Sequence, residues 1–374
     1  MHYHTIIVGL GGMGSAAAYH LAARGEKVLG IERYSPAHRN GSSHGNSRII
    51  RQAYFEHPSY VPLLKRAFSH WDDLARQADE DLLHLTGGLN IGRPDSDVIT
   101  GTLASVRTHN LPHEYLTAAD IRRRYPAFTP DDDIVGVAEG NAGYVVPEAA
   151  VRTHLRLAAQ HSATLRYNEV VLSWQATSSG VSVTTDQRTY TADHLILSPG
   201  AWAPELMADL GLPLRVERRV LLWFDPIGGD APFHEPHFPV YIWDCGEGVS
   251  FYGFPKQPGT AGIKVAIHTV GQHCTPQTID RTLHDSDVDT LQQLVRNRVP
   301  ALLGPMLDYA TCMYTLTPDE HFVIATHPDH PQVVLASPCS GHGFKFTPVI
   351  GEILADLAMH GRTNHDISLF SLRF

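Results

Sequence analysis

Gly9-Leu10-Gly11-Gly12-Met13-Gly14 is the most informative stretch of the chain. The apolar run Thr5 to Val8 before it predicts a buried strand, and the alanine-rich run Ser15 to Arg24 after it predicts a helix that ends at Gly25. Between a strand and a helix, glycines at the first, third and sixth positions permit a tight turn, close approach of a diphosphate to the backbone, and close helix–strand packing. The free N–H groups at the helix N-terminus would bind that diphosphate. The stretch therefore predicts a dinucleotide site.

Glu32 narrows the choice of dinucleotide. It follows Gly14 by 18 residues, at the end of a second expected strand, Lys27 to Ile31. An acidic residue at this place holds a ribose hydroxyl and disfavours a 2′-phosphate, so FAD or NAD is favoured over NADP. A plain NAD-dependent dehydrogenase is the least favoured enzyme, because the chain after Glu32 lacks the successive strand–helix units that it needs.

The composition is typical of an enzyme with a large core. The 374 residues are 43% hydrophobic and 18% charged, and their number exceeds one average domain. The formal net charge of −10 argues against nucleic acid or an anionic membrane as a partner. The 24 histidines are scattered and show no second ligand pair at metal spacing, so we expect no metal.

Three features predict a cytoplasmic location. The nucleotide-binding strand begins almost at the first residue, so we expect no signal peptide. No apolar run approaches the roughly 20 residues of a membrane span. The chain has no CxxC spacing, and its cysteines suggest no disulfide framework: Cys245, Cys274, Cys312 and Cys339.

Apolar spacing predicts the remaining elements. Helices are expected over 61–74, 118–124 and 147–162, and after the segment 341–346. Strands are expected within 165–198 and 215–270 and over 321–325 and 332–336. This pattern predicts an α/β (α+β) fold, with a Rossmann-type nucleotide-binding domain and a second domain on a mainly antiparallel sheet. The expected division gives 1–80, 145–215 and 305–374 to the first domain and 81–144 and 216–304 to the substrate-binding domain.

The segment 41–51, Gly-Ser-Ser-His-Gly-Asn-Ser-Arg-Ile-Ile-Arg, holds His44, Arg48 and Arg51 within eight residues. Arginine binds a carboxylate or phosphate through paired hydrogen bonds, so the segment fits an anion site. It fits a solvated polar loop with helix-capping serines equally well.

Two lysines and one cysteine leave similar choices open. Lys264 lies in an apolar strand and shares its face with His268, so it is either outward-facing or a cation that serves a pocket. Lys345, just before the last helix, is either an anion ligand or a surface lysine of the loop. Nothing in the composition favours Cys312 over Cys339 as a special thiol.

Taken together, the motifs resemble the monomeric sarcosine oxidase family, which includes N-methyltryptophan oxidase and belongs to the D-amino-acid-oxidase-like flavoproteins. The resemblance covers essentially the whole chain. Besides the glycine motif, Glu32 and segment 41–51, it rests on Tyr252-Gly253-Phe254-Pro255, Lys264, His268, Cys312-Met313-Tyr314, Asp319-Glu320-His321-Phe322 and Ser340 to Phe346.

The resemblance implies FAD as the cofactor, joined covalently to the sulfur of Cys312 through its 8α-methyl group. His44 and Arg48 would lie against the flavin ring, and the last helix would direct its N-terminus at the reduced flavin. The implied cofactor-binding residues are Gly9, Gly11, Gly12, Gly14, Glu32, Arg33, Ser42, Ser43, Arg48, Val170, Gly200, Trp202, Cys312, Met313, Gly341, Gly343, Phe344 and Lys345.

The resemblance also implies the reaction: oxidation of an N-methyl amino acid such as sarcosine to the demethylated amino acid, formaldehyde and hydrogen peroxide. Arg51 and Lys345 would clamp the substrate carboxylate, and Tyr252 and Tyr314 would line the pocket with His268. Lys264 would favour the reduction of O2. The implied catalytic residues are Lys264, His268, Arg48 and His44. The partners would be a small amine and O2, and the enzyme would be a monomer.

Departures from the family pattern concern the substrate. Phe55-Glu56-His57-Pro58 stands where the family tends to have glycines, which predicts a bulkier and stiffer flap. Gln52 and Cys339 also differ. The alternatives are an oxidase of a larger or cyclic amine (N-methyltryptophan, pipecolate, proline or a fructosyl amino acid), a flavin dehydrogenase that uses another acceptor, and a catalytically silent binding module. Retention of Arg51, Lys264, Cys312 and Lys345 disfavours the last.

Overall fold

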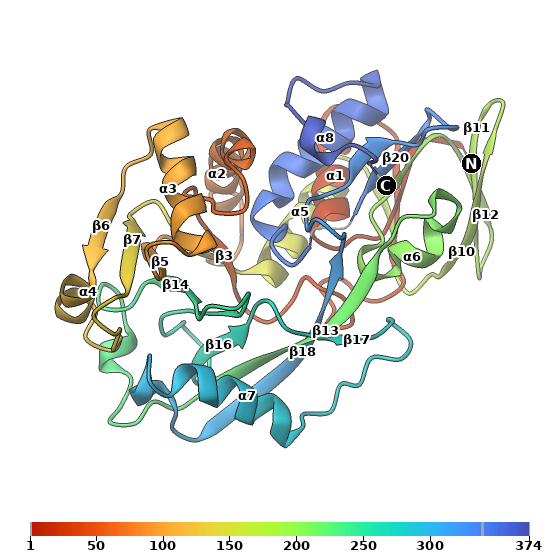
Figure 1. The fold of residues 1–374 in the computed structure, drawn as a ribbon. Coiled ribbons are helices and arrows are strands. Elements are labelled where there is room, and N and C mark those ends of the chain that lie inside the picture. Colours follow the sequence, from red (N-terminus) through yellow and green to blue (C-terminus); the bar gives the residue numbers. More distant parts are fainter. Residues whose placement is uncertain (1, 338–339, 374) are drawn as a thin grey trace.

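The structure, a computed structural model, describes residues 2–337 and 340–373. Two large sheets occupy different halves of the molecule, and helices pack against both (Figure 1). A third, small sheet consists of β3 (Arg48–Ile50), β8 (Gly143–Val145) and β4 (Leu83–His84). The expected α/β class with a mainly antiparallel second sheet is confirmed.

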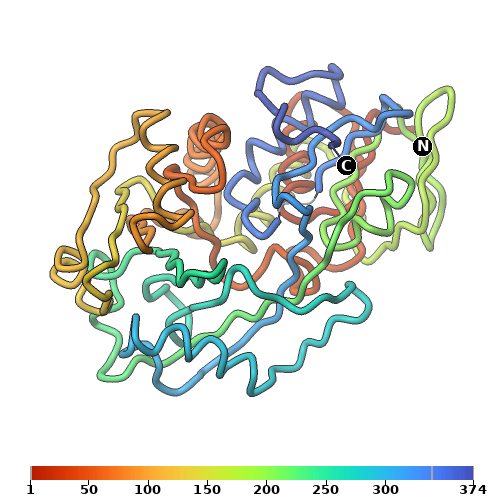
Figure 2. Tube along the Cα trace, viewed as in Figure 1, coloured from red at the N-terminus to blue at the C-terminus, as the bar shows by residue number. Residues whose placement is uncertain are grey.

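The first sheet begins with the strand before the glycine motif. Its parallel part has the order β9-β2-β1-β12-β20, with the antiparallel strands β10, β11 and β19 attached. The strands are β1 (His2–Val8), β2 (Val28–Ile31), β9 (Thr164–Arg166), β10 (Val171–Thr177), β11 (Gly180–Thr185), β12 (Thr189–Leu197), β19 (Ile324–Thr326) and β20 (Val333–Ala336). Segments from the start, middle and end of the chain therefore lie side by side, as Figure 2 shows by their red, green and blue colours.

Three helices from distant parts of the chain pack together beside this sheet: α1 (Gly12–Ala23), α5 (Pro147–Gln160) and α8 (Thr347–His360). The apolar face predicted for the last helix is buried, with Ile350, Ile353 and Leu354 at 1% exposure or less. The amphipathic α2 (Val61–Ala75) packs against α8 and begins at the residue that its apolar spacing predicts.

The second sheet has nine strands, in the order β17-β13-β16-β15-β14-β5-β7-β6 with β18 on the other side of β13. They are β5 (Gly88–Gly92), β6 (Glu114–Thr117), β7 (Val135–Glu139), β13 (Arg215–Phe224), β14 (Val240–Asp244), β15 (Ser250–Gly253), β16 (Ile263–Ile267), β17 (Gln272–His273) and β18 (Met306–Leu316). The helices of this half are α3 (Asp97–His109), α4 (Ala118–Arg124) and α7 (Asp285–Val295). The short α6 (Ala203–Leu206) follows β12.

Strand β18 departs from the expected division of the chain. Its residues fall in the segment 305–374 assigned to the nucleotide-binding domain, yet it hydrogen-bonds along the whole length of β13 in the second sheet. Its far end reaches the cavity beside the first sheet, because Met313, Tyr314 and Thr315 line that cavity. The strand thus connects the two halves. No helix in the described part of the chain is long and apolar enough to cross a membrane.

Candidate functional site

The glycine motif forms the turn between β1 and α1. Gly9 has a φ of +88°, and a Cβ atom there would lie 2.5 Å from the carbonyl oxygen of Ser198. A Cβ atom at Gly14 would lie 1.8 Å from the carbonyl oxygen of Gly9, so the first helical turn packs directly on the strand end. At Gly11 the nearest atom to a Cβ is 3.5 Å away, the hydroxyl of Ser43. A ligand can therefore approach the backbone of the turn at Gly11, whereas other backbone atoms fill the space beside Gly9 and Gly14.

Glu32 is fixed at the end of β2. One carboxylate oxygen accepts the N–H of Leu10 at 2.9 Å, and the other accepts the N–H of Tyr34 at 3.1 Å and lies 3.2 Å from Nε2 of His38. The side chain is buried. These bonds hold a carboxylate beside the glycine turn, where a ribose of a bound dinucleotide would lie.

A cavity of about 410 Å³ extends from this turn. Most of the implied cofactor residues line it: Gly9, Gly11, Gly12, Glu32, Arg33, Ser42, Ser43, Arg48, Gly200, Trp202, Met313, Gly341, Gly343 and Phe344. Four implied residues do not. Gly14 packs under the turn, Val170 lies between the lining residues Glu169 and Val171, Cys312 is buried next to Met313, and Lys345 lines a second cavity.

The second cavity, of about 50 Å³, adjoins the first and shares Arg48, Tyr314, Gly341 and Phe344 with it. The five residues expected to contact a substrate line this cavity: Arg51, Tyr252, His268, Tyr314 and Lys345. They come from four distant segments of the chain, so only the fold brings them together. Ile242, Glu56 and His342 complete much of the lining.

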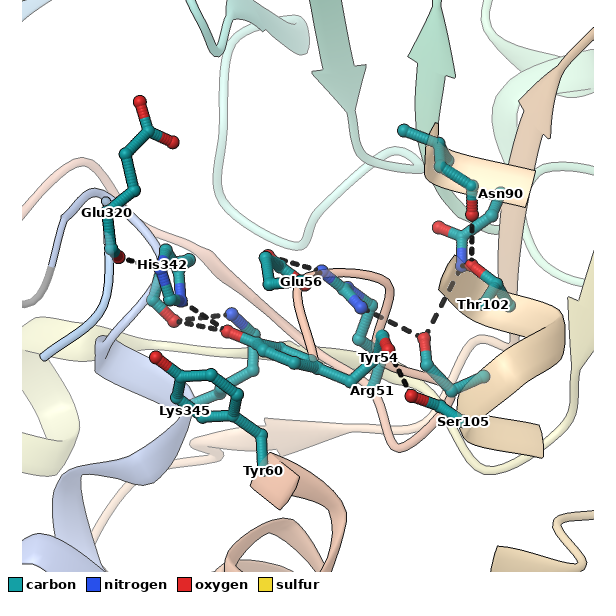
Figure 3. A network of polar contacts seen from close by, with 12 residues as sticks. Arg51, Tyr54, Glu56, Tyr60, Asn90, Thr102, Ser105, Glu320, His342 and Lys345 are labelled. Atoms are coloured by element: carbon teal, nitrogen blue, oxygen red, sulfur yellow. Dashed lines mark hydrogen bonds and ion pairs between the residues drawn. The ribbon is translucent and has the colours of Figure 1, made fainter. Parts of the chain in front are cut away.

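Arg51 already contacts a carboxylate of its own chain, which Figure 3 shows. Its Nη2 donates to both oxygens of Glu56, at 2.8 and 2.7 Å, and its Nη1 donates to the carbonyl of Ala53 at 2.9 Å. Burial would raise the pKa of Glu56, but Arg51, His342 and Lys345 lower it to about 2. Glu56 is therefore an anion at neutral pH, placed at the group expected to bind the substrate carboxylate.

Lys345 and Arg51 both lie beside the ring of Tyr54. Nζ of Lys345 donates to the carbonyl of His342 at 2.6 Å and is 5.1 Å from the centre of the Tyr54 ring, while the Arg51 guanidinium is 4.2 Å from that centre. Figure 3 shows both cations beside the same ring. The interpretation of Lys345 as a surface lysine is wrong, because its side chain is buried.

Lys264 is also buried, at 1% exposure, so the outward-facing interpretation is wrong. Its ammonium group donates to the carbonyl oxygens of Gly45 and Ser47, at 2.7 and 2.9 Å, and lies 3.1 Å from the Ser47 hydroxyl. Burial and then the charge of Arg48 hold the pKa of Lys264 well below its usual value. Segment 45–47 is thus a folded acceptor for one cation and not a solvated loop.

Arg48, Cys312 and His44 lie close together beside this segment, with Cys312 and His44 buried and Arg48 partly exposed. Arg48 donates to the carbonyl oxygens of Ser47 and Ser42, at 2.8 and 2.9 Å, and its Nη2 is 3.5 Å from the sulfur of Cys312. Burial, followed by the charges of Arg48 and Lys264, lowers the pKa of His44 to about 3. The imidazole of His44 is therefore neutral at physiological pH.

His268, Tyr252 and Tyr314 also line the small cavity. Nδ1 of His268 lies 3.4 Å from the hydroxyl of Tyr314, and burial lowers the pKa of His268 to about 3. Burial and the neighbouring Tyr314 raise the pKa of Tyr252 well above its usual value. These groups are neutral hydrogen-bonding partners. Cys339, one of the departures from the family pattern, lies outside the described residues.

The sequence profile described as DAO, FAD dependent oxidoreductase, matches residues 4–357. The chain belongs to this family of FAD-dependent oxidoreductases.

The sequence of the oxidoreductase is similar to those of known proteins over its full length. It is 50% identical to the monomeric sarcosine oxidase of Streptomyces avermitilis over 373 residues, which are 99% of this chain and 97% of the relative. It is 34% identical to the N-methyl-L-tryptophan oxidase of Yersinia pestis (strain Pestoides F), over 100% of this chain and 99% of the relative. A solved structure of NikD, an unusual amino acid oxidase essential for nikkomycin biosynthesis, has a TM-score of 0.86 and 26% identity, and covers 100% of this chain and 98% of its own.

The cavity of the oxidoreductase fits FAD by its own features. The indole N–H of Trp202, which lines the cavity, is buried and has no hydrogen-bond partner among the described residues. The open backbone at Gly11 and the carboxylate of Glu32 suit a diphosphate and a ribose. No cluster of three or more His, Cys, Asp or Glu side chains with metal-binding geometry occurs in residues 2–337 and 340–373.

Several lining residues of the oxidoreductase were not predicted from the sequence. Ser198 follows β12 and Ser337 follows β20, the two strands beside and beyond β1. Ligands in open parallel sheets bind at the carboxyl ends of the strands, so the residue after each expected strand was a usable signal. His342 and Ile242 carried no such signal, because loop conformation and pairing across the second sheet place them.

Proposed function

We propose that the enzyme oxidises a small N-methyl amino acid such as sarcosine, with water and O2 as the other reactants and the demethylated amino acid, formaldehyde and hydrogen peroxide as products. The observation that carries this proposal is the convergence of Arg51 and Lys345 on a small cavity that adjoins the dinucleotide cavity. Two buried cations beside neutral, aromatic side chains suit a substrate that has one carboxylate and no large side chain.

The size of the cavity favours a small substrate over a larger amine. Its volume of about 50 Å³ is far below the roughly 300 Å³ at which pockets for drug-sized ligands begin. Phe55 lies 4.6 Å from the Arg51 guanidinium and belongs to the same flap. An indole substituent would require movement of this flap, which disfavours N-methyltryptophan.

Arg51 must exchange partners when the substrate binds. The substrate carboxylate would take the place of Glu56 on the guanidinium, and Lys345 would supply the second positive charge. His268, Tyr252 and Tyr314 would orient the amine as neutral groups and would exclude water.

When bound, FAD supplies the electron transfer from the amine to O2. The glycine turn, Glu32 and Trp202 would hold it, and Cys312 would be its covalent attachment point through an 8α-S-cysteinyl bond. The position of Cys312 supports this, since its sulfur lies beside Arg48 and its neighbour Met313 lines the cavity.

Lys264 would stabilise the negative charge that develops on oxygen. A cation that is already in place in a dry site is most effective in this role, because it needs no reorganisation during the reaction. Its burial and its three acceptors support the assignment. We also propose a monomeric, cytoplasmic enzyme whose partners are small molecules.

The test begins with the absorption spectrum of the purified protein before and after acid precipitation. Yellow colour that stays in the pellet, and that Cys312→Ser releases, is the expected result. A substrate panel with peroxide detection then separates sarcosine from larger and cyclic amines. Normal reduction by sarcosine without peroxide formation would favour a dehydrogenase, and a protein that takes up no FAD would overturn the proposal.

A further inference from the structure

We propose that Glu148 is a positioning residue for Lys264, acting as its counter-ion through the single peptide group between Gly45 and Asn46. This inference rests on the oxygen role proposed for Lys264. Neither Glu148 nor Lys264 lines a cavity, and Glu148 contacts the backbone that binds Lys264, so it acts through Lys264 and not by contact with a substrate.

The hydrogen bonds of one peptide group connect the two charges. Nζ of Lys264 donates to the carbonyl oxygen of Gly45 at 2.7 Å. The N–H of Asn46, on the same peptide group, donates to Oε1 of Glu148 at 3.2 Å, and the N–H of Gly45 donates to that oxygen at 2.6 Å. The negative end of the peptide dipole therefore faces the cation and its positive end faces the anion. Each charge strengthens the hydrogen bond of the other.

The backbone conformation at this peptide group is unusual, and the hydrogen bonds to Glu148 hold it in place. Gly45 and Asn46 have φ values of +95° and +66°, which places two successive residues in the left-handed region. The positive φ of Gly45 would strain any side chain there, and a Cβ atom would lie 2.6 Å from Cδ1 of Leu221. Glu148, held in the first turn of α5, fixes both N–H groups from one oxygen. The carbonyl of Gly45 is thereby aimed at Lys264.

The charges around Lys264 explain why a carboxylate matters. Arg48 lies on the same segment, and His44 is neutral, so the residues of the loop itself offer no negative charge. Burial and Arg48 lower the pKa of Lys264, whereas Glu148, followed by Cys312, raises it. The other carboxylate oxygen of Glu148, Oε2, is buried and has no hydrogen-bond partner among the described residues. Glu148 thus favours the ammonium form of Lys264.

The first experiment measures the two half-reactions of Glu148→Gln holoenzyme separately by stopped flow. The glutamine carbonyl can still accept both N–H groups, but the charge is lost. We expect re-oxidation by O2 to slow about tenfold or more, with anaerobic reduction by sarcosine within about twofold of the wild type. The pH above which re-oxidation slows should also move down, since the ammonium form loses its counter-ion. Glu148→Asp, which keeps the charge, should restore part of the rate.

The second experiment does not depend on turnover. Thermal unfolding of the wild type, Glu148→Gln, Lys264→Met and the double variant forms a double-mutant cycle. We expect Glu148→Gln to lower the Tm by about 2 °C or more when Lys264 is present and by clearly less in the Lys264→Met protein. Equal losses in both backgrounds would overturn the coupling.

The outcomes separate this inference from the proposed function. If Lys264→Met re-oxidises normally, the oxygen role of Lys264 fails, and the unfolding cycle alone decides whether Glu148 is its counter-ion. If Lys264→Met is slow but Glu148→Gln is normal in both half-reactions, the oxygen role stands and the inference about Glu148 fails.

Discussion

For Arg51 the sequence predicted the kind of ligand but not its identity. Its charge and its place in segment 41–51 predicted an anion ligand, and it does bind a carboxylate, but that carboxylate is Glu56. The two residues are five apart in a loop, where no periodicity tells which side chains meet. The pairing implies that a substrate competes with an internal anion for the same guanidinium.

Replacing Arg51 by alanine should raise KM for carboxylated substrates by about 10- to 100-fold, the usual effect of losing a hydrogen bond between charged groups. Steady-state kinetics with sarcosine measures this effect. Glu56→Gln should have the opposite effect, a lower KM, because it removes the competing anion. An unchanged KM in Arg51→Ala would place the carboxylate elsewhere.

The carboxyl group of Glu139 should make the stability of the fold depend on pH. Its carboxylate is buried and accepts the N–H groups of Gln52 and Ala53, at 3.1 and 2.9 Å, and burial raises its pKa to about 7. A raised carboxyl pKa means that the native state binds the proton more tightly than the unfolded chain. This contribution to stability is full below the unfolded pKa, near 4.5, and is lost as the pH rises through about 7.

The free energy of unfolding should therefore fall by up to about 3 kcal/mol between pH 5 and pH 8 through this one group. Glu139→Gln keeps an acceptor for both N–H groups and removes the titration. Denaturant unfolding at several pH values should show a flatter profile for the variant. Parallel profiles for the two proteins would contradict the raised pKa.

Among the helices and strands, those with one buried face were predictable. Helices α2, α4 and α5 begin at the expected residues, because apolar side chains recur with the helical period and proline or capping residues mark the starts. Strand β18 was not predicted. Its first residues are exposed and its last six are all buried, so alternation with period two never appears along it.

The turn between β1 and α1 gives a sharp test of element packing. Gly14→Ala should abolish flavin incorporation, because its Cβ would lie 1.8 Å from the carbonyl oxygen of Gly9 and would force helix and strand apart. Gly140→Ala is the matched control, since no atom lies within 4 Å of a Cβ there. The flavin-to-protein absorbance ratio of both variants measures the difference. Normal flavin content in Gly14→Ala would refute the packing role.

For the molecule as a whole, the sequence predicted the two sheets but not which residues of each sheet line the dinucleotide cavity. The glycine turn, the serines after β12 and β20, and the end of β18 all line the dinucleotide cavity. Contacts between segments hundreds of residues apart leave no local pattern, which is why Lys264 could not be assigned to segment 45–47 from sequence.

A ligand held by so many segments should stabilise the whole fold. In Cys312→Ser, which cannot form the proposed covalent bond, the Tm should rise with added FAD. At a hundredfold excess over the dissociation constant the gain is about 2.7 kcal/mol. Wild-type protein that already carries its flavin should not respond. A Tm of Cys312→Ser that is independent of FAD would contradict binding in this cavity.

The pairing of β12 with β20 also fixes an order of events during synthesis. The parallel sheet is completed only when residues 333–336 join it, and α8 follows them in the chain. A nascent chain still attached to the ribosome at that stage has the glycine turn but lacks the last part of the cavity. We therefore expect stable cofactor capture to be post-translational, and chains truncated before β20 to lack flavin and to be degraded by proteases.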